Sequence, residues 1–115
     1  MEDLILKFPK LRIWIMHSGY PFIEETVGIM SVYWNVYTDI SVIANPDNIP
    51  YKDFYTTMKR LIDAGLENRL MFGSDNGNIK QVIESVNKLD FLSSEQKEKI
   101  FHKNAEQFFE KSKKN

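Results

Sequence analysis

Three short apolar segments alternate along the chain with longer segments of helical periodicity. The apolar segments are residues 11–17, 35–41 and 70–75, and each of them ends in polar residues. Their low charge and β-branched or aromatic content are typical of strands that are covered on both faces in a parallel sheet. Parallel strands must be joined by crossover connections, so the segments between them are expected to be helical. The sequence therefore predicts an α/β fold built from repeated β/α units.

Apolar spacing and turn residues predict where the helices lie. Helical spacing recurs over residues 22–33, 54–62 and 79–86. Pro21 is expected to be the first residue of the first of these helices, because its missing N–H would be unpaired there in any case. Gly65 is placed where the second helix needs a left-handed residue to end.

Both ends of the chain carry further helix signals. Residues 3–8 are expected to end a helix before the proline that follows them. Ser93 with Gln96, and Asn104 with Gln107, each match the spacing of a capping box. We therefore expect two short C-terminal helices rather than one long helix.

The composition fits one compact domain over residues 1–115, since 43% of the residues are hydrophobic. Fifteen Lys and Arg against 16 Asp and Glu give a net charge of −1, which selects neither nucleic acid nor an anionic membrane as a partner. The absence of cysteine excludes disulfides, thiolate zinc sites and a cysteine nucleophile, and it fits a reducing cytoplasm. No apolar run approaches the ~20 residues that span a bilayer, and the N-terminus lacks the layout of a signal peptide. We expect a cytoplasmic protein with no nucleic-acid or membrane partner.

Polar residues at the strand ends are the candidates for chemistry. His17 ends the first predicted strand and Asp75 ends the last, and ligands of parallel α/β proteins collect at the carboxyl ends of the strands. Each residue also has a structural interpretation, because a histidine can pack in the core and an aspartate can cap the turn that follows it. Asp39 ends the middle strand among hydroxyl residues, which favours a structural role in local hydrogen bonds. His102 lies far from any strand end and is not a ligand candidate.

The sequence gives little support for a complete metal site, a serine nucleophile or a phosphate-binding loop. A catalytic metal needs about three protein ligands and an open position, and His17 with Asp75 supplies two at most. The chain has no Gly-x-Ser-x-Gly nucleophile elbow and no glycine-rich phosphate-binding motif.

Five motifs occur in a fixed order along nearly the whole chain. They are Phe-Pro-Lys-Leu-Arg-Ile (8–13), Met-His-Ser-Gly-Tyr-Pro (16–21), Asn-Val-Tyr-Thr-Asp (35–39), Arg-Leu-Met-Phe-Gly-Ser-Asp (69–75) and Asn-Ala-Glu-Gln-Phe-Phe (104–109). This set resembles the C-terminal part of the amidohydrolase-related family. That family includes the metal-dependent TIM-barrel hydrolases and decarboxylases related to aminocarboxymuconate semialdehyde decarboxylase.

The resemblance implies that the three strands are the sixth, seventh and eighth of a TIM barrel, so the chain would be a partial barrel with C-terminal helices. It implies that His17 acts on the catalytic water or the substrate. It also implies that Asp75 binds a divalent metal, which we expect to be zinc, and accepts a proton from the bound water. The substrate would be a small molecule.

Two departures from the family pattern limit what is carried over. The family's His-x-His pair on the first barrel strand and its metal-binding histidine on the fifth are not in this chain. Residues 76–78, Asn-Gly-Asn, replace an aromatic-proline pair that shapes the pocket in many members. The isolated chain is therefore expected to be inactive, and its substrate class stays open.

Two functions follow from these observations. In the first, the chain is part of a metal-dependent hydrolase whose activated water attacks a carbonyl substrate at a C–N, C–O or C–C bond, once an N-terminal half-barrel complements it. In the alternative, it is a non-enzymatic remnant or interaction domain that forms a homo-oligomer through open sheet edges. A receiver-like or flavodoxin-like domain ranks below both, because the expected acidic cluster and strand-end lysine are missing.

Overall fold

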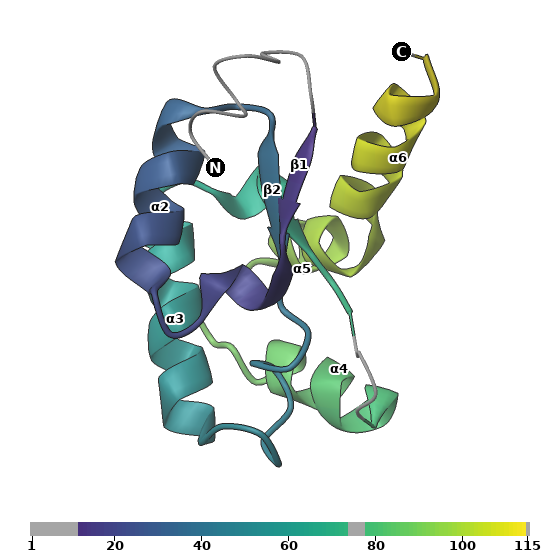
Figure 1. Ribbon diagram of the computed structural model, residues 1–115. Coiled ribbons are helices and arrows are strands. Elements are labelled where there is room, and N and C mark those ends of the chain that lie inside the picture. The colour runs from purple at the N-terminus through teal and green to yellow at the C-terminus, as the bar shows by residue number, and fades with distance from the viewer. Residues whose placement is uncertain (1–11, 74–77, 115) are drawn as a thin grey trace.

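A three-stranded parallel sheet forms the centre of the molecule (Figure 1). The computed structural model describes residues 12–73 and 78–114, with side chains up to residue 109. Strands β1 (Ile13–Ile15), β2 (Val36–Asp39) and β3 (Leu70–Met71) lie in that spatial order, with β1 and β3 both paired to β2 in parallel. The parallel α/β arrangement predicted from the sequence is confirmed.

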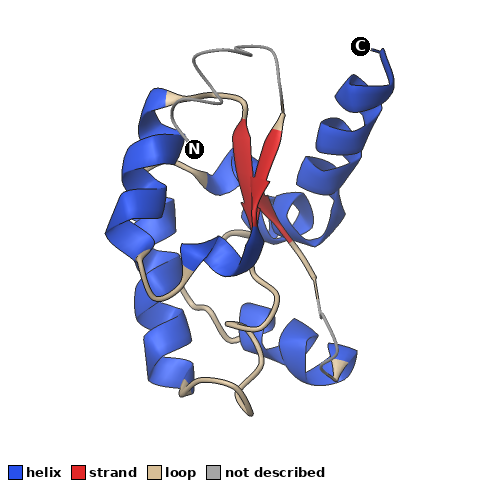
Figure 2. Cartoon of the chain, in the orientation of Figure 1, coloured by secondary structure: helices blue, strands red, loops and turns tan. Residues whose placement is uncertain are grey.

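Helices and helical turns connect the strands (Figure 2). In chain order they are the 3₁₀ turn η1 (Met16–Gly19), α2 (Ile23–Val32), α3 (Tyr51–Asp63), the 3₁₀ turn η2 (Glu67–Arg69), α4 (Ile79–Asn87), α5 (Ser94–Glu98), the π-helical turn η3 (Lys99–Lys103) and α6 (Asn104–Lys114).

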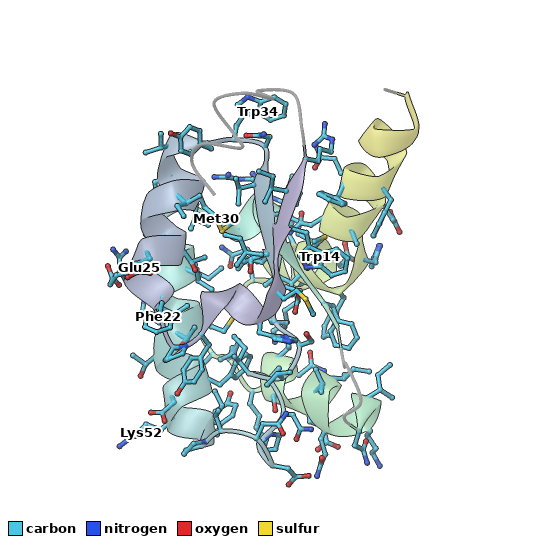
Figure 3. All side chains as sticks on the ribbon, in the orientation of Figure 1. Trp14, Phe22, Glu25, Met30, Trp34 and Lys52 are labelled. Carbon is cyan, nitrogen blue, oxygen red and sulfur yellow. The ribbon has the colours of Figure 1, made fainter. Side chains whose placement is uncertain are left out.

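Strands β2 and β3 are buried on both faces, whereas Trp14 of β1 is 47% exposed. Side chains alternate between the two faces of a strand, so Val36 and Leu70 share the main core with the buried residues of α2 and α3. Tyr37 and Met71 face the other way and pack against Phe108 of α6. Figure 3 shows Met30 between α2 and the sheet. Burial on both faces is consistent with the low charge of the β2 and β3 segments.

Arg69 ties α2 to the sheet. Its guanidinium donates to the carbonyl oxygens of Met30 (2.6 Å), Tyr33 (2.8 Å) and Val36 (3.1 Å). A cation at the carboxyl end of α2 complements the free carbonyl groups there. Desolvation lowers the pKa of Arg69 from its ordinary value, but the group stays charged and holds the junction between α2 and β2.

The strands are shorter than the sequence predicts. The first was expected over 11–17, but after Ile15 the chain leaves the sheet because His17 and Ser18 both adopt left-handed backbone angles (φ 57°). Pro21 does not open the following helix, which begins at Ile23. The proline lies in the preceding turn, after a cis peptide bond.

Gly65 ends α3 as predicted. Its φ of +79° allows the N–H of Leu66 to reach back to the carbonyl of Leu61 at 3.2 Å, which satisfies a free carbonyl at the helix end.

One of the two predicted capping boxes is present. Ser93 and Gln96 exchange reciprocal hydrogen bonds at the start of α5. The second prediction is wrong, because α5, η3 and α6 run on without a break and Asn104 lies inside this helix. The Asn104 amide nitrogen donates instead to the carbonyl oxygens of Glu67 (2.7 Å) and Leu70 (2.8 Å). The predicted helix over residues 3–8 lies outside the described part of the chain.

The outer edge of β3 is also bonded. Alternate residues of a strand direct their polar backbone groups to opposite sides, so Leu70 and Phe72 face away from β2. The Leu70 carbonyl accepts from Asn104, and the Phe72 N–H donates to the carbonyl of Ile100 in η3 at 2.8 Å. The C-terminal helix therefore satisfies these two polar backbone groups at the outer edge of β3.

Within the described ranges, none of the helices combines the length and apolar character that a membrane span needs.

Candidate functional site

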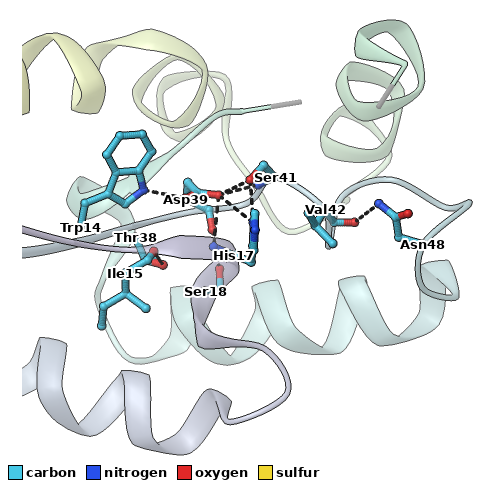
Figure 4. Close-up of polar contacts among 9 residues, drawn as sticks. All are labelled: Trp14, Ile15, His17, Ser18, Thr38, Asp39, Ser41, Val42 and Asn48. Carbon is cyan, nitrogen blue, oxygen red and sulfur yellow. Dashed lines mark hydrogen bonds and ion pairs between the residues drawn. The ribbon is translucent and has the colours of Figure 1, made fainter. Parts of the chain in front are cut away.

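Asp39 is the centre of a hydrogen-bonded network at the carboxyl ends of β1 and β2 (Figure 4). Its side chain is 3% exposed. One carboxylate oxygen accepts from the Trp14 indole N–H at 2.5 Å. The other accepts from the backbone N–H of Ser41 (2.9 Å), from the Ser41 hydroxyl, and from the backbone N–H of His17 (3.3 Å). All four partners are donors, so the group binds as a carboxylate.

His17 reaches this network through a strained turn. Left-handed angles cost a residue other than glycine about 1–2 kcal/mol, and both His17 and Ser18 adopt them. Three hydrogen bonds hold the turn: the His17 N–H to Asp39, the Ser18 hydroxyl to the Asp39 carbonyl (2.9 Å), and the Tyr20 N–H to the His17 carbonyl (3.0 Å). Asp39 and its backbone thus fix where the histidine leaves the sheet.

The imidazole of His17 is joined to Asp39 through Ser41. Its Nδ1 lies 2.9 Å from the Ser41 hydroxyl oxygen and 3.7 Å from Oδ1 of Asp39. The His17 side chain is 29% exposed, so solvent reaches part of the ring. Among the described residues, its Nε2 has no hydrogen-bond partner. Within the described ranges, the network therefore holds one ring nitrogen and leaves the other without a hydrogen bond.

The chain after β3 passes against the same network. A Cβ atom placed on Gly73 would lie 3.2 Å from Cβ of Ser41, closer than nearly all ordinary contacts of this kind. The absence of a side chain at Gly73 thus allows the segment that leaves β3 to approach Ser41.

The structure brings together two of the polar strand-end residues named from the sequence, His17 and Asp39. Asp39 has the local hydrogen bonds expected of it, and it also contacts the His17 turn. Asp75 lies outside the described residues. His102 is exposed in η3, with Nδ1 2.9 Å from Oε1 of Glu106.

Two members of the network were not identified as site residues from the sequence. Ser41 follows Asp39 by two residues, a spacing typical of a local side-chain to backbone turn, and this signal was available. Trp14 has no such signal, because only the pairing of β1 with β2 brings its indole to Asp39.

The described residues alone do not form a metal centre. Nowhere among them do three or more histidine, aspartate or glutamate side chains gather closely enough to hold an ion. The network is instead suited to positioning an imidazole, since its single carboxylate is already saturated by donors.

Comparison with known sequences decides the family, because the sequence model of the amidohydrolase family matches residues 1–111. The chain belongs to the amidohydrolase family. A comparison with curated proteins finds no match. The amidohydrolase resemblance inferred from the five motifs is confirmed.

Solved structures share the fold. An uncharacterized TIM-barrel protein from Bordetella bronchiseptica is similar with a TM-score of 0.79 and 21% identity, over 96% of this chain and 38% of that one. An amidohydrolase from Burkholderia multivorans with bound zinc gives a TM-score of 0.74 and 15% identity, over 95% and 47%. The same enzyme with bound HEPES gives 0.73 and 14%, over 95% and 48%. The amidohydrolase-family chain thus spans less than half the length of these barrels, in agreement with a partial barrel.

Proposed function

We propose that residues 1–115 form the C-terminal part of a metal-dependent amidohydrolase and supply its sixth, seventh and eighth barrel strands. The observation that carries this proposal is the His17 network. It lies at the carboxyl ends of parallel strands, where barrel enzymes build their sites, in a fold that matches an amidohydrolase over 95% of this chain and a TIM-barrel protein over 96%. The earlier strands would come from another polypeptide or a longer product.

His17 is the proposed proton carrier. Its Nδ1 is held by Ser41, and its Nε2 is free among the described residues to exchange a proton with a small-molecule substrate or with the attacking water. General acid–base catalysis of this kind contributes about 10²- to 10⁴-fold to a rate. His17 would supply that factor in hydrolysis or decarboxylation at a carbonyl-linked bond.

Asp75 is the proposed metal ligand, and it would also accept a proton from the bound water. Its position in the sequence supports this role, because Gly73, two residues earlier, lies against Ser41 of the His17 network. The zinc in the Burkholderia amidohydrolase supports a divalent metal, which lowers the pKa of bound water toward neutrality in such enzymes. The remaining ligands would have to come from the complementing strands, so the isolated chain is expected to be inactive.

Complementation tests the proposal. The chain would be produced together with a polypeptide that carries the earlier barrel strands, and the purified complex assayed for zinc by atomic emission and for hydrolysis of ester and amide substrates. Asp75→Asn should lose the metal, whereas His17→Gln should keep it and lose about 10²- to 10⁴-fold in turnover. Asp47→Asn, at an exposed loop residue, is the matched control. A complex that binds no metal, or one whose hydrolysis is unaffected by both changes, would contradict the proposal.

The alternative is an interaction domain that self-associates through open sheet edges. The bonded outer edge of β3 does not separate the two proposals, because pairing at that edge, with a second copy or with a complementing strand, must displace the bonds of Leu70 and Phe72 to the C-terminal helix. Sedimentation velocity across a range of concentrations would test this alternative.

A cytoplasmic location remains part of the proposal and is supported by the cysteine-free composition.

A further inference from the structure

We propose that Ser41 is a positioning residue that fixes the tautomer of His17. In this arrangement the neutral imidazole carries its proton on Nδ1, and Nε2 keeps a lone pair. The link runs from His17 through the Ser41 hydroxyl to the Asp39 carboxylate.

The inference follows from counting protons between three groups. The Ser41 oxygen lies within hydrogen-bond distance of both His17 Nδ1 and Asp39 Oδ1, and its hydroxyl has one hydrogen to donate. The carboxylate is only an acceptor, so the Ser41 hydrogen belongs to the bond with Asp39. Ser41 can then only accept from His17, which requires a hydrogen on Nδ1.

Burial limits the hydrogen-bond partners that the Ser41 hydroxyl can reach. Ser41 is 7% exposed, its backbone N–H also donates to Asp39, and Gly73 approaches its Cβ. Trp14 holds the other carboxylate oxygen, so the carboxylate itself is fixed from two sides. The acceptor presented to Nδ1 is therefore part of the folded core rather than a mobile surface group.

This tautomer determines which nitrogen can act. A neutral imidazole with its hydrogen on Nδ1 accepts a proton only at Nε2, the nitrogen that is free among the described residues. The use of that lone pair in catalysis rests on the proposed function, whereas the tautomer itself is a property of the folded chain. The two can therefore be tested separately.

The test is a spectrum of the imidazole nitrogens. The chain has two histidines, so long-range ¹H–¹⁵N correlation spectra of the ¹⁵N-labelled protein, at a pH where both are neutral, resolve each ring. We expect His17 to show a pyrrole-like Nδ1 and a pyridine-like Nε2. Ser41→Ala should shift the tautomer ratio toward the Nε2–H form by roughly two- to tenfold, the effect of one hydrogen bond of ordinary net strength.

Ser85→Ala is the matched control. Ser85 is 3% exposed and its hydroxyl donates to the Gln81 carbonyl in α4, so this variant removes a buried hydroxyl outside the network. Its His17 ratio should equal that of the unmodified protein, and His102 should be unchanged in both variants.

Two results would overturn the inference. One is an Nε2–H tautomer of His17 in the unmodified protein, a measurement that needs no variant to fold. The other is a tautomer ratio in Ser41→Ala equal to that in Ser85→Ala. The spectrum is recorded without metal or substrate, so it tests the tautomer independently of catalysis. If His17 carries its hydrogen on Nδ1 but the complemented complex is inactive, the proposed function is rejected and the positioning role of Ser41 stands.

Discussion

Removal of the Asn104 amide should destabilise the fold, because it breaks two hydrogen bonds between the C-terminal helix and the segment that leads into β3. Asn104 is 2% exposed, and the two hydrogens of its amide group satisfy two carbonyl oxygens of the η2–β3 segment. In Asn104→Ala, the carbonyl of the fully buried Leu70 loses its partner, which costs about 1–3 kcal/mol. The carbonyl of Glu67 is nearer to solvent, so the loss of its hydrogen bond should cost about 1 kcal/mol. The free energy of unfolding should therefore fall by about 2–4 kcal/mol.

Urea denaturation followed by circular dichroism measures this loss. Gln107→Ala is the control, because Gln107 is exposed on the same helix and was the expected partner of Asn104 in a capping box. It should change the free energy of unfolding by less than about 0.5 kcal/mol. Asn104→Asp keeps the shape of the side chain but turns an acceptor toward the two carbonyls. Near neutral pH this variant should lose at least as much free energy of unfolding as Asn104→Ala, and part of that loss should be recovered on acidification.

The reasoning would be refuted if Gln107→Ala destabilised the chain as much as Asn104→Ala. That result would mean that a helix begins at Asn104, as the sequence pattern predicts. A loss below about 0.5 kcal/mol for Asn104→Ala would equally show that neither carbonyl depends on the amide.

Three further changes test other features. Gly19→Ala should lower the free energy of unfolding by about 2–4 kcal/mol, since φ is +69° and a Cβ would collide with the Thr26 hydroxyl of α2. Gly28→Ala, in open space within α2, should raise the free energy of unfolding by about 0.5–1 kcal/mol, and thermal melts compare the two variants. Val42→Asn should raise the melting temperature, because asparagine tolerates the φ of +66° and Val42 lies outside the described core. The hydrogen bond from Arg60 lowers the pKa of Glu24, so that pair stabilises above the unfolded pKa of about 4.3 and loses its effect as pH falls. The urea midpoint of Glu24→Gln should be lower than that of the unmodified chain near pH 7 and equal to it near pH 2.5. Equal midpoints at both pH values would contradict this prediction.

Local patterns account for most of the helices that were predicted. The apolar spacing of α3, its end at Gly65 and the Ser93 capping box all depend on residues within a few positions of each other. The strand lengths were overestimated, because an apolar run continues through Met16 while the backbone turns out of the sheet. Hydrophobicity carries no signal for left-handed angles at a histidine and a serine.

The candidate site was predictable only in part. His17 and Asp39 could be placed at one edge of a parallel sheet, because successive strands end on the same side. Their connection through Ser41, and the contact of Asp39 with Trp14, depend on strand register and on the direction of the turn. Asn104 fits a capping motif equally well, and only its tertiary neighbours show that it serves the loop before β3 instead.

The bonded edge of β3 has a kinetic consequence for any closure into a barrel. A strand that pairs there must take over Leu70 O and Phe72 N, which Asn104 and Ile100 now occupy. Pairing at this edge is therefore an exchange of partners, and we expect release of the helix to precede it. The rate of assembly should level off as the complementing strands become more concentrated, at a limit set by how often the C-terminal helix detaches.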